Sequence, residues 1–200
     1  GEETLRVLAL RGARVIGLAR SESKAQAALK GLPGTPVACE LSEPGSIDQA
    51  VKHVQNLPML DGIIANAGIM ALPERTVKHG LELQFLTNHL GHFRLITALL
   101  PRLTERARVV MVSSRAHHRA WPEGIRLDDL DASGAYTPWG AYGQSKLANL
   151  LFAKELAKRL PPGQTANSLH PGVIATNLGR HLSRPAQLGL SVLGPLVLKS

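Results

Sequence analysis

Apolar and polar positions alternate along the chain in two ways. Apolar residues three and four positions apart are typical of amphipathic helices, whereas short runs rich in Val, Ile and Leu are typical of buried strands. Helices are predicted at Glu2–Arg11, at Glu22–Lys30, at Ser46–Asn56 with Ser46 as the cap, over most of Lys78–Leu103, and at Ala135–Leu160. Strands are predicted at Arg14–Ala19, Pro36–Glu40, Gly62–Asn66, Ala107–Ser113 and Thr165–Leu169. This succession predicts an α/β fold with a doubly wound parallel sheet and helices on both faces.

The last predicted helix carries Tyr142 and Lys146, four residues apart and therefore on one face. A unit positive charge about 4 Å from the phenol contributes ~4 kcal/mol at an effective dielectric constant of roughly 20. That energy corresponds to about three pKa units, so Lys146 is predicted to lower the pKa of Tyr142 enough for acid/base chemistry near neutral pH. The spacing alone leaves a second interpretation open, because Tyr and Lys at this distance often form a solvated surface pair.

Four further segments accompany this pair in a fixed order. Ile63–Gly68 is an apolar run that ends in Asn-Ala-Gly, Asn88 lies in a helical stretch, Val109–Ser114 ends in two hydroxyls, and His170–Thr176 follows the last strand. Together with Tyr-Gly-Gln-Ser-Lys, they resemble the short-chain dehydrogenase/reductase family, most closely its retinol-dehydrogenase-like branch. The resemblance extends from Gly1 to about Thr176. It implies a Rossmann-type fold, with residues 1–200 as a single catalytic domain that binds a dinucleotide.

The resemblance implies a catalytic role for four residues. Tyr142 would exchange a proton with the substrate oxygen, Lys146 would activate the phenol and bind the nicotinamide ribose, and Ser114 would polarise the substrate oxygen. Asn88 would anchor a water chain that relays protons through Lys146. Simpler interpretations stay open. Ser113 competes with Ser114 for this role, and Ser114 could merely form a hydrogen bond with the backbone at the end of a strand. An Asn in a helix is often a local backbone partner.

The resemblance also implies a set of cofactor-binding positions. Arg20 stands where an NAD-preferring member carries an acid, and a guanidinium pairs well with a 2′-phosphate, so NADP(H) is favoured over NAD(H). Glu40 replaces the usual Asp near the adenine amino group. The cofactor-binding residues implied in this way are Gly1, Arg20, Glu40, Leu41, Asn66, Ala67, Gly68, Tyr142, Lys146, Pro171, Gly172, Val173 and Thr176.

The comparison with the family pattern suggests an internal fragment. In the family, a strand and a glycine-rich loop precede the segment that begins at Gly1, and further elements follow Ser200. We expect Gly1 to be the last glycine of that loop and the sheet to be incomplete at both ends. Because the missing strand is central in such sheets, Arg14–Ala19 and Gly62–Asn66 are expected to flank an unfilled position.

Composition narrows the remaining classes. The 200 residues are 44% hydrophobic and 19% charged, which suits one globular domain, and Cys39 as the sole cysteine favours a reducing, cytoplasmic location. The sequence has no apolar run long enough to span a bilayer. The net charge of +8 is scattered and aromatic residues are only 4%, so nucleic-acid binding is not expected. His89 and His92 lack a third ligand, so no metal site is expected either.

These observations predict an NADP(H)-dependent oxidoreductase. It would transfer hydride between the nicotinamide and an alcohol or carbonyl group of a small, apolar substrate, the apolar preference resting on the family branch alone. The alternative is a catalytically inactive family member that acts as a scaffold through protein contacts. The helices at 78–103 and 135–160 form the dimer surface in many relatives, so a homodimer or homotetramer is expected in either case.

Overall fold

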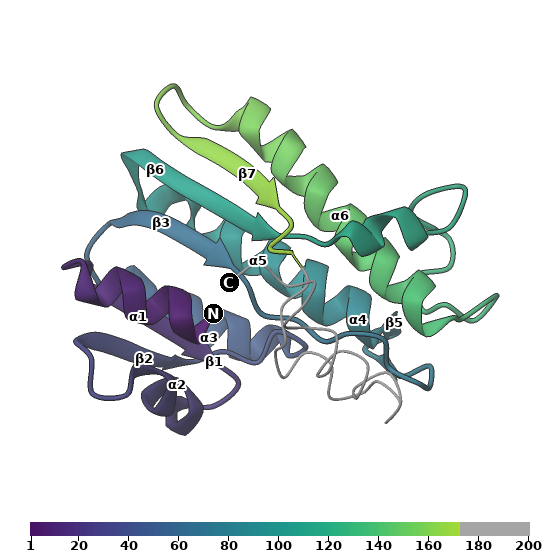
Figure 1. Cartoon of the computed structure of the whole chain (residues 1–200), viewed down its shortest axis with the longest axis horizontal. Helices are drawn as coiled ribbons and strands as arrows, with labels where there is room; N and C mark the ends of the chain where they lie inside the picture. The colour runs from purple at the N-terminus through teal and green to yellow at the C-terminus, as the bar shows by residue number, and fades with distance from the viewer. Residues whose placement is uncertain (173–200) are drawn as a thin grey trace. The chain divides into compact units, whose positions relative to one another are not determined.

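The computed structural model describes residues 1–172 (Figure 1). Contacts divide the chain into two compact units. The first comprises Gly1–Met59 and Gly91–Arg102, and the second comprises Leu60–Leu90 and the chain from Leu103 onward. That residues 1–200 form one domain stays a prediction.

The first unit is built on strands β1 (Val15–Ala19) and β2 (Gly34–Ala38), which pair in parallel. Helices α1 (Glu2–Leu10) and α2 (Glu22–Leu29) pack on this pair. Both reach the same point of β1: a Cβ at Gly17 would lie 3.1 Å from Leu5 and 3.8 Å from Leu29. The glycine therefore lets two helices approach one strand.

Helices α3 (Pro44–Gln55) and α5 (Gly91–Leu99) complete the first unit and pack on each other. The Arg94 guanidinium donates two hydrogen bonds to the Asp48 carboxylate, at 2.9 and 2.7 Å. At the start of α5, a Cβ on Gly91 would collide with the Leu41 carbonyl, so only glycine allows this approach. Leu41 is thereby held against α5.

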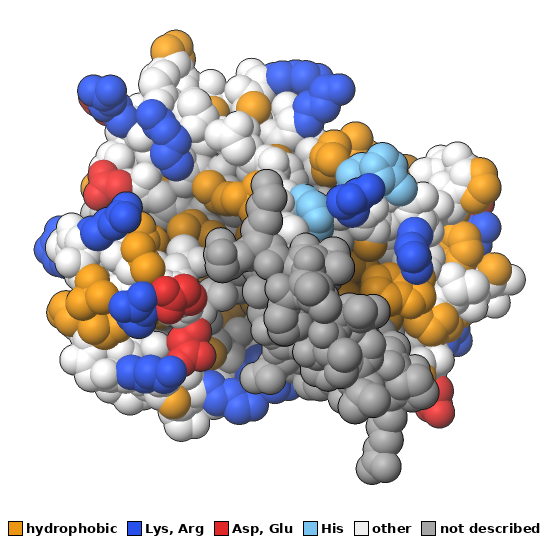
Figure 2. All heavy atoms as spheres, in the orientation of Figure 1, with side chains coloured by type: hydrophobic (Ala, Val, Ile, Leu, Met, Phe, Trp, Pro, Cys, Tyr) orange, Lys and Arg blue, Asp and Glu red, His pale blue; other side chains and the backbone are white. Residues whose placement is uncertain are grey.

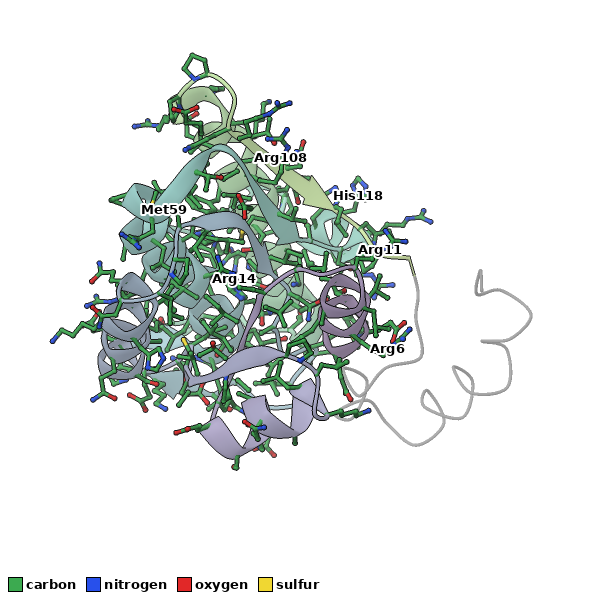
Figure 3. All side chains as sticks on the ribbon, turned by 90° about the vertical axis from the view of Figure 1, so that its left-hand side faces the viewer. Arg6, Arg11, Arg14, Met59, Arg108 and His118 are labelled. Atoms are coloured by element: carbon green, nitrogen blue, oxygen red, sulfur yellow. The ribbon has the colours of Figure 1, made fainter. Side chains whose placement is uncertain are left out.

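The second unit contains a parallel sheet in the order β3-β6-β7, formed by Leu60–Ala65, Leu103–Val112 and Thr165–Leu169. The long helix α6 (Pro138–Arg159) packs on β6 and β7 and runs beside them in Figure 1. Val109 and Met111 of β6 are fully buried and form part of the core. In the middle of β6, Arg108 donates a 3.0 Å hydrogen bond to the Gly163 carbonyl in the turn before β7 (Figure 3).

The segment predicted as mostly helix divides into several elements. Its helical part is α4 (Leu83–Phe85), the π-helical turn η1 (Leu86–Leu90), α5 and the short η2 (Leu100–Arg102). Before it lies a hairpin of β4 (Val77–Lys78) and β5 (Leu81–Glu82). His79 and Gly80 at its tip both have positive φ, 52° and 73°, as a tight hairpin turn requires. The helix prediction is therefore wrong at Lys78–Glu82 and confirmed beyond.

Two other element boundaries differ from the prediction because of capping. Helix α6 begins at Pro138 rather than Ala135, since the Thr137 hydroxyl accepts a 3.0 Å hydrogen bond from the Gly140 N–H and proline suits the first helical position. Ser46 does not cap α3, which already begins at Pro44; its hydroxyl accepts from the Glu40 N–H at 2.9 Å. The parallel strand pairs flanked by helices confirm the predicted α/β class.

Charge and hydrophobicity are spread over the described surface. Figure 2 shows Lys and Arg side chains at several separate places on one face. Within residues 1–172, every helix is too short or too polar to cross a membrane.

Candidate active site

Helix α6 places Tyr142 and Lys146 on one buried face in the second unit. Their exposed fractions are 3% and 4%, and Lys146 Nζ lies 5.7 Å from the centroid of the Tyr142 ring. The interpretation as a solvated surface pair is therefore wrong. Burial of two polar side chains one helical turn apart requires partners for both, and these partners define the site.

The Lys146 ammonium is anchored to the end of strand β6. Nζ donates a 2.9 Å hydrogen bond to the Val112 carbonyl. Because burial penalises the charged form, the pKa of Lys146 falls from 10.5 to about 8. The side chain thus remains charged at neutral pH but is close to the point where it can release a proton.

The pKa of Tyr142 moves opposite to the predicted direction. Burial raises it above the ordinary value of 10.0, and a hydrogen bond with the Ser114 hydroxyl only partly offsets this effect. The prediction assumed a unit charge about 4 Å from the phenol. In the structure, Lys146 Nζ donates to the Val112 carbonyl instead, and the phenol is buried. At neutral pH the phenol is therefore protonated, which is the form that can act as an acid.

Ser113 and Ser114 have different partners. The Ser113 hydroxyl is buried and donates a 2.7 Å hydrogen bond to the Lys146 carbonyl, so it joins β6 to α6. The Ser114 hydroxyl accepts from the Ala116 N–H at 3.1 Å, at the start of η3 (Arg115–Arg119), and its interaction with Tyr142 lowers the pKa of the phenol. Ser114 is the serine that contacts the phenol, although it also serves the backbone.

Asn88 lies in the π-helical turn η1 and is fully buried. Its Oδ1 accepts from the Ile69 N–H at 2.8 Å, while Nδ2 donates to the Ile69 carbonyl at 2.9 Å and to Ser145 Oγ at 3.0 Å. Asn88 is thus a backbone partner, but of a segment 19 residues away rather than of its own helix. Single π-turns within helices are frequent at functional sites.

The Asn66-Ala67-Gly68 turn follows strand β3 and leads to Ile69. Asn66 and Ala67 are exposed, whereas Gly68 is half-buried. A Cβ on Gly68 would lie 3.0 Å from Asn88 Oδ1 and 3.6 Å from Lys146 Nζ. The turn therefore lies next to Asn88 and the lysine, and the absence of a side chain at Gly68 allows this close approach.

The candidate cofactor residues of the first unit have looser surroundings. Arg20 is exposed directly after β1 and forms no ion pair with another described residue. Glu40 accepts from the N–H and hydroxyl of Ser42, at 3.1 and 3.0 Å. Leu41 is buried, and Gly1 caps α1, whose first turn carries two ion-paired carboxylates, Glu2 and Glu3. An unpaired, exposed guanidinium is what a 2′-phosphate site requires.

Beyond β7, Pro171 and Gly172 are exposed, and Gly172 has a φ of 87°. Val173 and Thr176 lie outside the described residues.

Sequence reasoning missed two residues that complete the buried face of α6. Ser145 bonds Asn88, and Asn149 Oδ1 lies 3.1 Å from His89 Nδ1. The pKa of His89 is lowered by burial. Helical periodicity could have found them, because positions 142, 145, 146 and 149 share one helix face.

Comparisons with known proteins agree with this geometry. A family model described as Enoyl-(Acyl carrier protein) reductase matches residues 1–192. Short-chain dehydrogenase TIC 32 B, chloroplastic, of Brassica napus is 38% identical over 96% of this chain and 65% of its own length. Human retinol dehydrogenase 13 is 39% identical over 98% of this chain and 62% of its own. This chain thus spans less than two thirds of the length of these relatives.

A similar solved structure is that of an uncharacterized protein from Mycobacterium paratuberculosis. It matches with a TM-score of 0.76 and 43% identity, over 90% of this chain and 67% of the other. Together with the parallel strand order, this likeness confirms the predicted Rossmann-type fold.

Proposed function

The chain belongs to the short-chain dehydrogenase/reductase family, and on that premise we propose that it is an NADP(H)-dependent oxidoreductase. It would transfer hydride between the nicotinamide and an alcohol or carbonyl group of a small, apolar substrate. The observation that carries this proposal is the buried cluster of the second unit, in which Tyr142 lies one helical turn from Lys146 and Ser114 is near enough to lower the pKa of the phenol. This cluster combines an acid, a hydrogen-bond donor and a cation, the groups that carbonyl reduction needs.

In the reduction direction, Tyr142 donates its proton to the substrate oxygen. Its raised pKa keeps the phenol protonated at neutral pH, so the acid is present before the substrate arrives. Ser114 donates a hydrogen bond to the same oxygen and stabilises the negative charge that develops there. The bound nicotinamide supplies the hydride.

Lys146 then stabilises the deprotonated Tyr142 and takes part in the proton transfer. Its positive charge stabilises the phenolate that Tyr142 becomes, because a unit charge in a buried site acts with little screening. With a pKa of about 8, it can also release a proton at modest cost, and the Asn88 and Gly68 side of the lysine is where that proton would travel. Lys146 would also bind the nicotinamide ribose.

Two features support the choice of cofactor and substrate. The exposed Arg20, without an ion-pair partner among the described residues, would pair with the 2′-phosphate of NADP(H). The similar human protein is named for retinol, an apolar alcohol. Both point to NADP(H) and an apolar alcohol or aldehyde, with Asn66, Ala67, Gly68, Pro171, Gly172, Val173 and Thr176 as further cofactor contacts.

The test is the rate of NADPH oxidation by the complete protein, with nonanal, 4-nitrobenzaldehyde and all-trans-retinal as probes. Tyr142→Phe removes only the hydroxyl and is expected to lower the rate by roughly 10²- to 10⁴-fold, the usual contribution of a general acid. Tyr136→Phe is the matched control, because its hydroxyl donates at 2.6 Å to the Leu72 carbonyl in the same unit. It should retain the activity.

Two results would overturn the proposal. Equal rates for the wild type and Tyr142→Phe would exclude the phenol as the acid. A complete protein that binds neither NADPH nor NADH in a fluorescence titration would exclude the oxidoreductase altogether.

A further inference from the structure

Ser145 lies between the two proposed catalytic residues of α6 and is fully buried. Its Oγ is 2.7 Å from the Tyr142 carbonyl and 3.0 Å from Asn88 Nδ2. A carbonyl oxygen can only accept, so the single hydroxyl proton of Ser145 is donated to Tyr142. Towards Asn88, the same oxygen must therefore act as an acceptor.

This assignment fixes the role of each atom in the Asn88 amide. One N–H donates to the Ile69 carbonyl, the other donates to Ser145, and Oδ1 accepts from the Ile69 N–H. If the positions of Oδ1 and Nδ2 were exchanged, Oδ1 would face the Ile69 carbonyl and Ser145 Oγ, which both act as acceptors. Oδ1 consequently faces Gly68, on the side where Lys146 Nζ approaches the same glycine.

We infer that Ser145 is a positioning residue, whose hydroxyl ties Asn88 in η1 to the turn of α6 that carries Tyr142 and Lys146. The inference rests on the proposed function, because it assigns Ser145 a role in the proton transfer of that site. Without the hydroxyl, Asn88 loses the hydrogen bond that joins it to α6, and its amide is expected to shift. A shift of Asn88 would act on Gly68, whose Cβ position lies 3.0 Å from Asn88 Oδ1 and 3.6 Å from Lys146 Nζ.

The simpler interpretation is that the Ser145 hydroxyl only forms a local hydrogen bond within α6 and does not position Asn88. Serine hydroxyls in helices often donate to the carbonyl three or four residues earlier, as Ser145 does to Tyr142. That local bond does not involve Asn88, so Ser145→Ala would then leave Asn88 and the proton chemistry unchanged. The two interpretations differ in what happens at Asn88 and at Ile69.

The first measurement is the pH profile of NADPH oxidation by the complete protein with the aldehyde probes. Ser145→Ala is expected to lower kcat about 10-fold and to change the KM for NADPH less than about twofold, because the variant affects proton transfer rather than binding. The alkaline limb of the profile should move to higher pH as Lys146 becomes better solvated. Ser168→Ala is the matched control: its buried hydroxyl has no hydrogen-bond partner among the described residues. An unchanged kcat and profile in Ser145→Ala would overturn the inference.

The second measurement follows the Ile69 N–H by hydrogen exchange, which requires no catalysis. Ser145→Ala should accelerate its exchange, since Asn88 Oδ1 is its acceptor, while Ser168→Ala should not. In a double-mutant cycle, the effect of Ser145→Ala on kcat should disappear in an Asn88→Ala background. Unchanged exchange, or a full additional loss in that background, would show that Ser145 does not act through Asn88.

The two measurements separate this inference from the proposed function. If none of the aldehyde probes supports NADPH oxidation by the wild type, and the wild type binds no NADPH, the proposed function is contradicted. The inference then fails with it, whatever the exchange data show. Normal turnover with unchanged exchange contradicts the inference alone. Faster exchange with an unchanged kcat would reduce Ser145 to a structural link and also overturns the inference.

Discussion

The proposed catalytic residues of the second unit and the proposed cofactor residues of the first unit differ in how firmly they are held. Asn88, Tyr142 and Lys146 have exposed fractions of 0%, 3% and 4%, and backbone or side-chain bonds hold each of them. Arg20 is exposed and forms no ion pair within the described chain, and the Glu40 carboxylate accepts hydrogen bonds from the N–H and hydroxyl of the nearby Ser42.

This difference separates two kinds of functional group. A buried polar side chain must find its partners during folding, so its position and pKa are set before any ligand arrives. An exposed guanidinium keeps its rotamer freedom and gains a fixed position only when an anion binds it. Substitutions in the second unit should therefore change the rate together with the stability or its pH dependence, whereas Arg20 should affect the choice of cofactor alone.

Lys146→Met is expected to have the largest effect on this comparison. Met preserves the apolar stem but removes the charge, so turnover should fall by more than about 10²-fold. The shift of the Lys146 pKa from 10.5 to about 8 corresponds to roughly 3 kcal/mol by which the fold disfavours the charged form. Removing that charge therefore offsets the lost bond to Val112, and the variant should be about as stable as the wild type at pH 7.

The pH dependence of unfolding tests whether the fold lowers the pKa of Lys146. Between about pH 8 and 10.5, the unfolded chain keeps the Lys146 proton while the folded protein has released it. The unfolded state then binds more protons, so the wild type gains stability relative to Lys146→Met as pH rises through this window. Urea unfolding of both proteins at pH 7 and pH 10 measures the difference. If the wild type lost stability relative to the variant over this window, the buried, depressed lysine would be contradicted.

Gly68→Ala should have an intermediate effect. Gly68 does not adopt a positive φ, so the backbone accepts alanine, but the new Cβ would lie 3.0 Å from Asn88 Oδ1. Asn88 must shift, which is expected to lower turnover by about 10-fold and stability by roughly 1–3 kcal/mol, as overpacking usually does.

Gly45→Ala provides the control for this substitution. Gly45 lies in the first turn of α3 with no atom near its Cβ position, so alanine there should be neutral or stabilise the helix by up to about 1 kcal/mol. Rates from NADPH oxidation and midpoints from urea unfolding compare the pair. Equal behaviour of the two alanine variants would mean that the Gly68 turn does not constrain Asn88.

Local patterns predicted the elements that carry the site. Strand β7 was predicted at Thr165–Leu169, as observed, and the common face of Tyr142 and Lys146 followed from helical spacing. Both depend on short-range periodicity, which sequence expresses directly. The choice of Ser114 over Ser113 came instead from the family resemblance and stays a prediction.

Features set by long-range contacts were not predictable in the same way. The sign of the Tyr142 shift depends on burial by surrounding segments, and the π-helical turn at Asn88 is fixed by bonds to Ile69 and Ser145, which are 19 and 57 positions away. The hairpin before α4 was missed although its His79-Gly80 turn was visible, because helical residues follow it closely.

Arg20→Ala should have the smallest and most selective effect. If the guanidinium binds the 2′-phosphate, the variant loses one exposed charge-assisted contact, and the Kd for NADPH should rise about 10-fold while that for NADH stays nearly constant. Unfolding midpoints should not change, since exposed substitutions rarely matter for stability.

Arg14→Ala is the matched control, because this arginine lies just before β1, at the end opposite Arg20 (Figure 3). Fluorescence titrations at low and high salt measure both. Added salt should weaken NADPH binding more in the wild type than in Arg20→Ala, since the wild type has one more exposed ionic contact for the salt to screen. An equal loss for NADPH and NADH would mean that Arg20 does not distinguish the cofactors and would remove the main support for NADP(H).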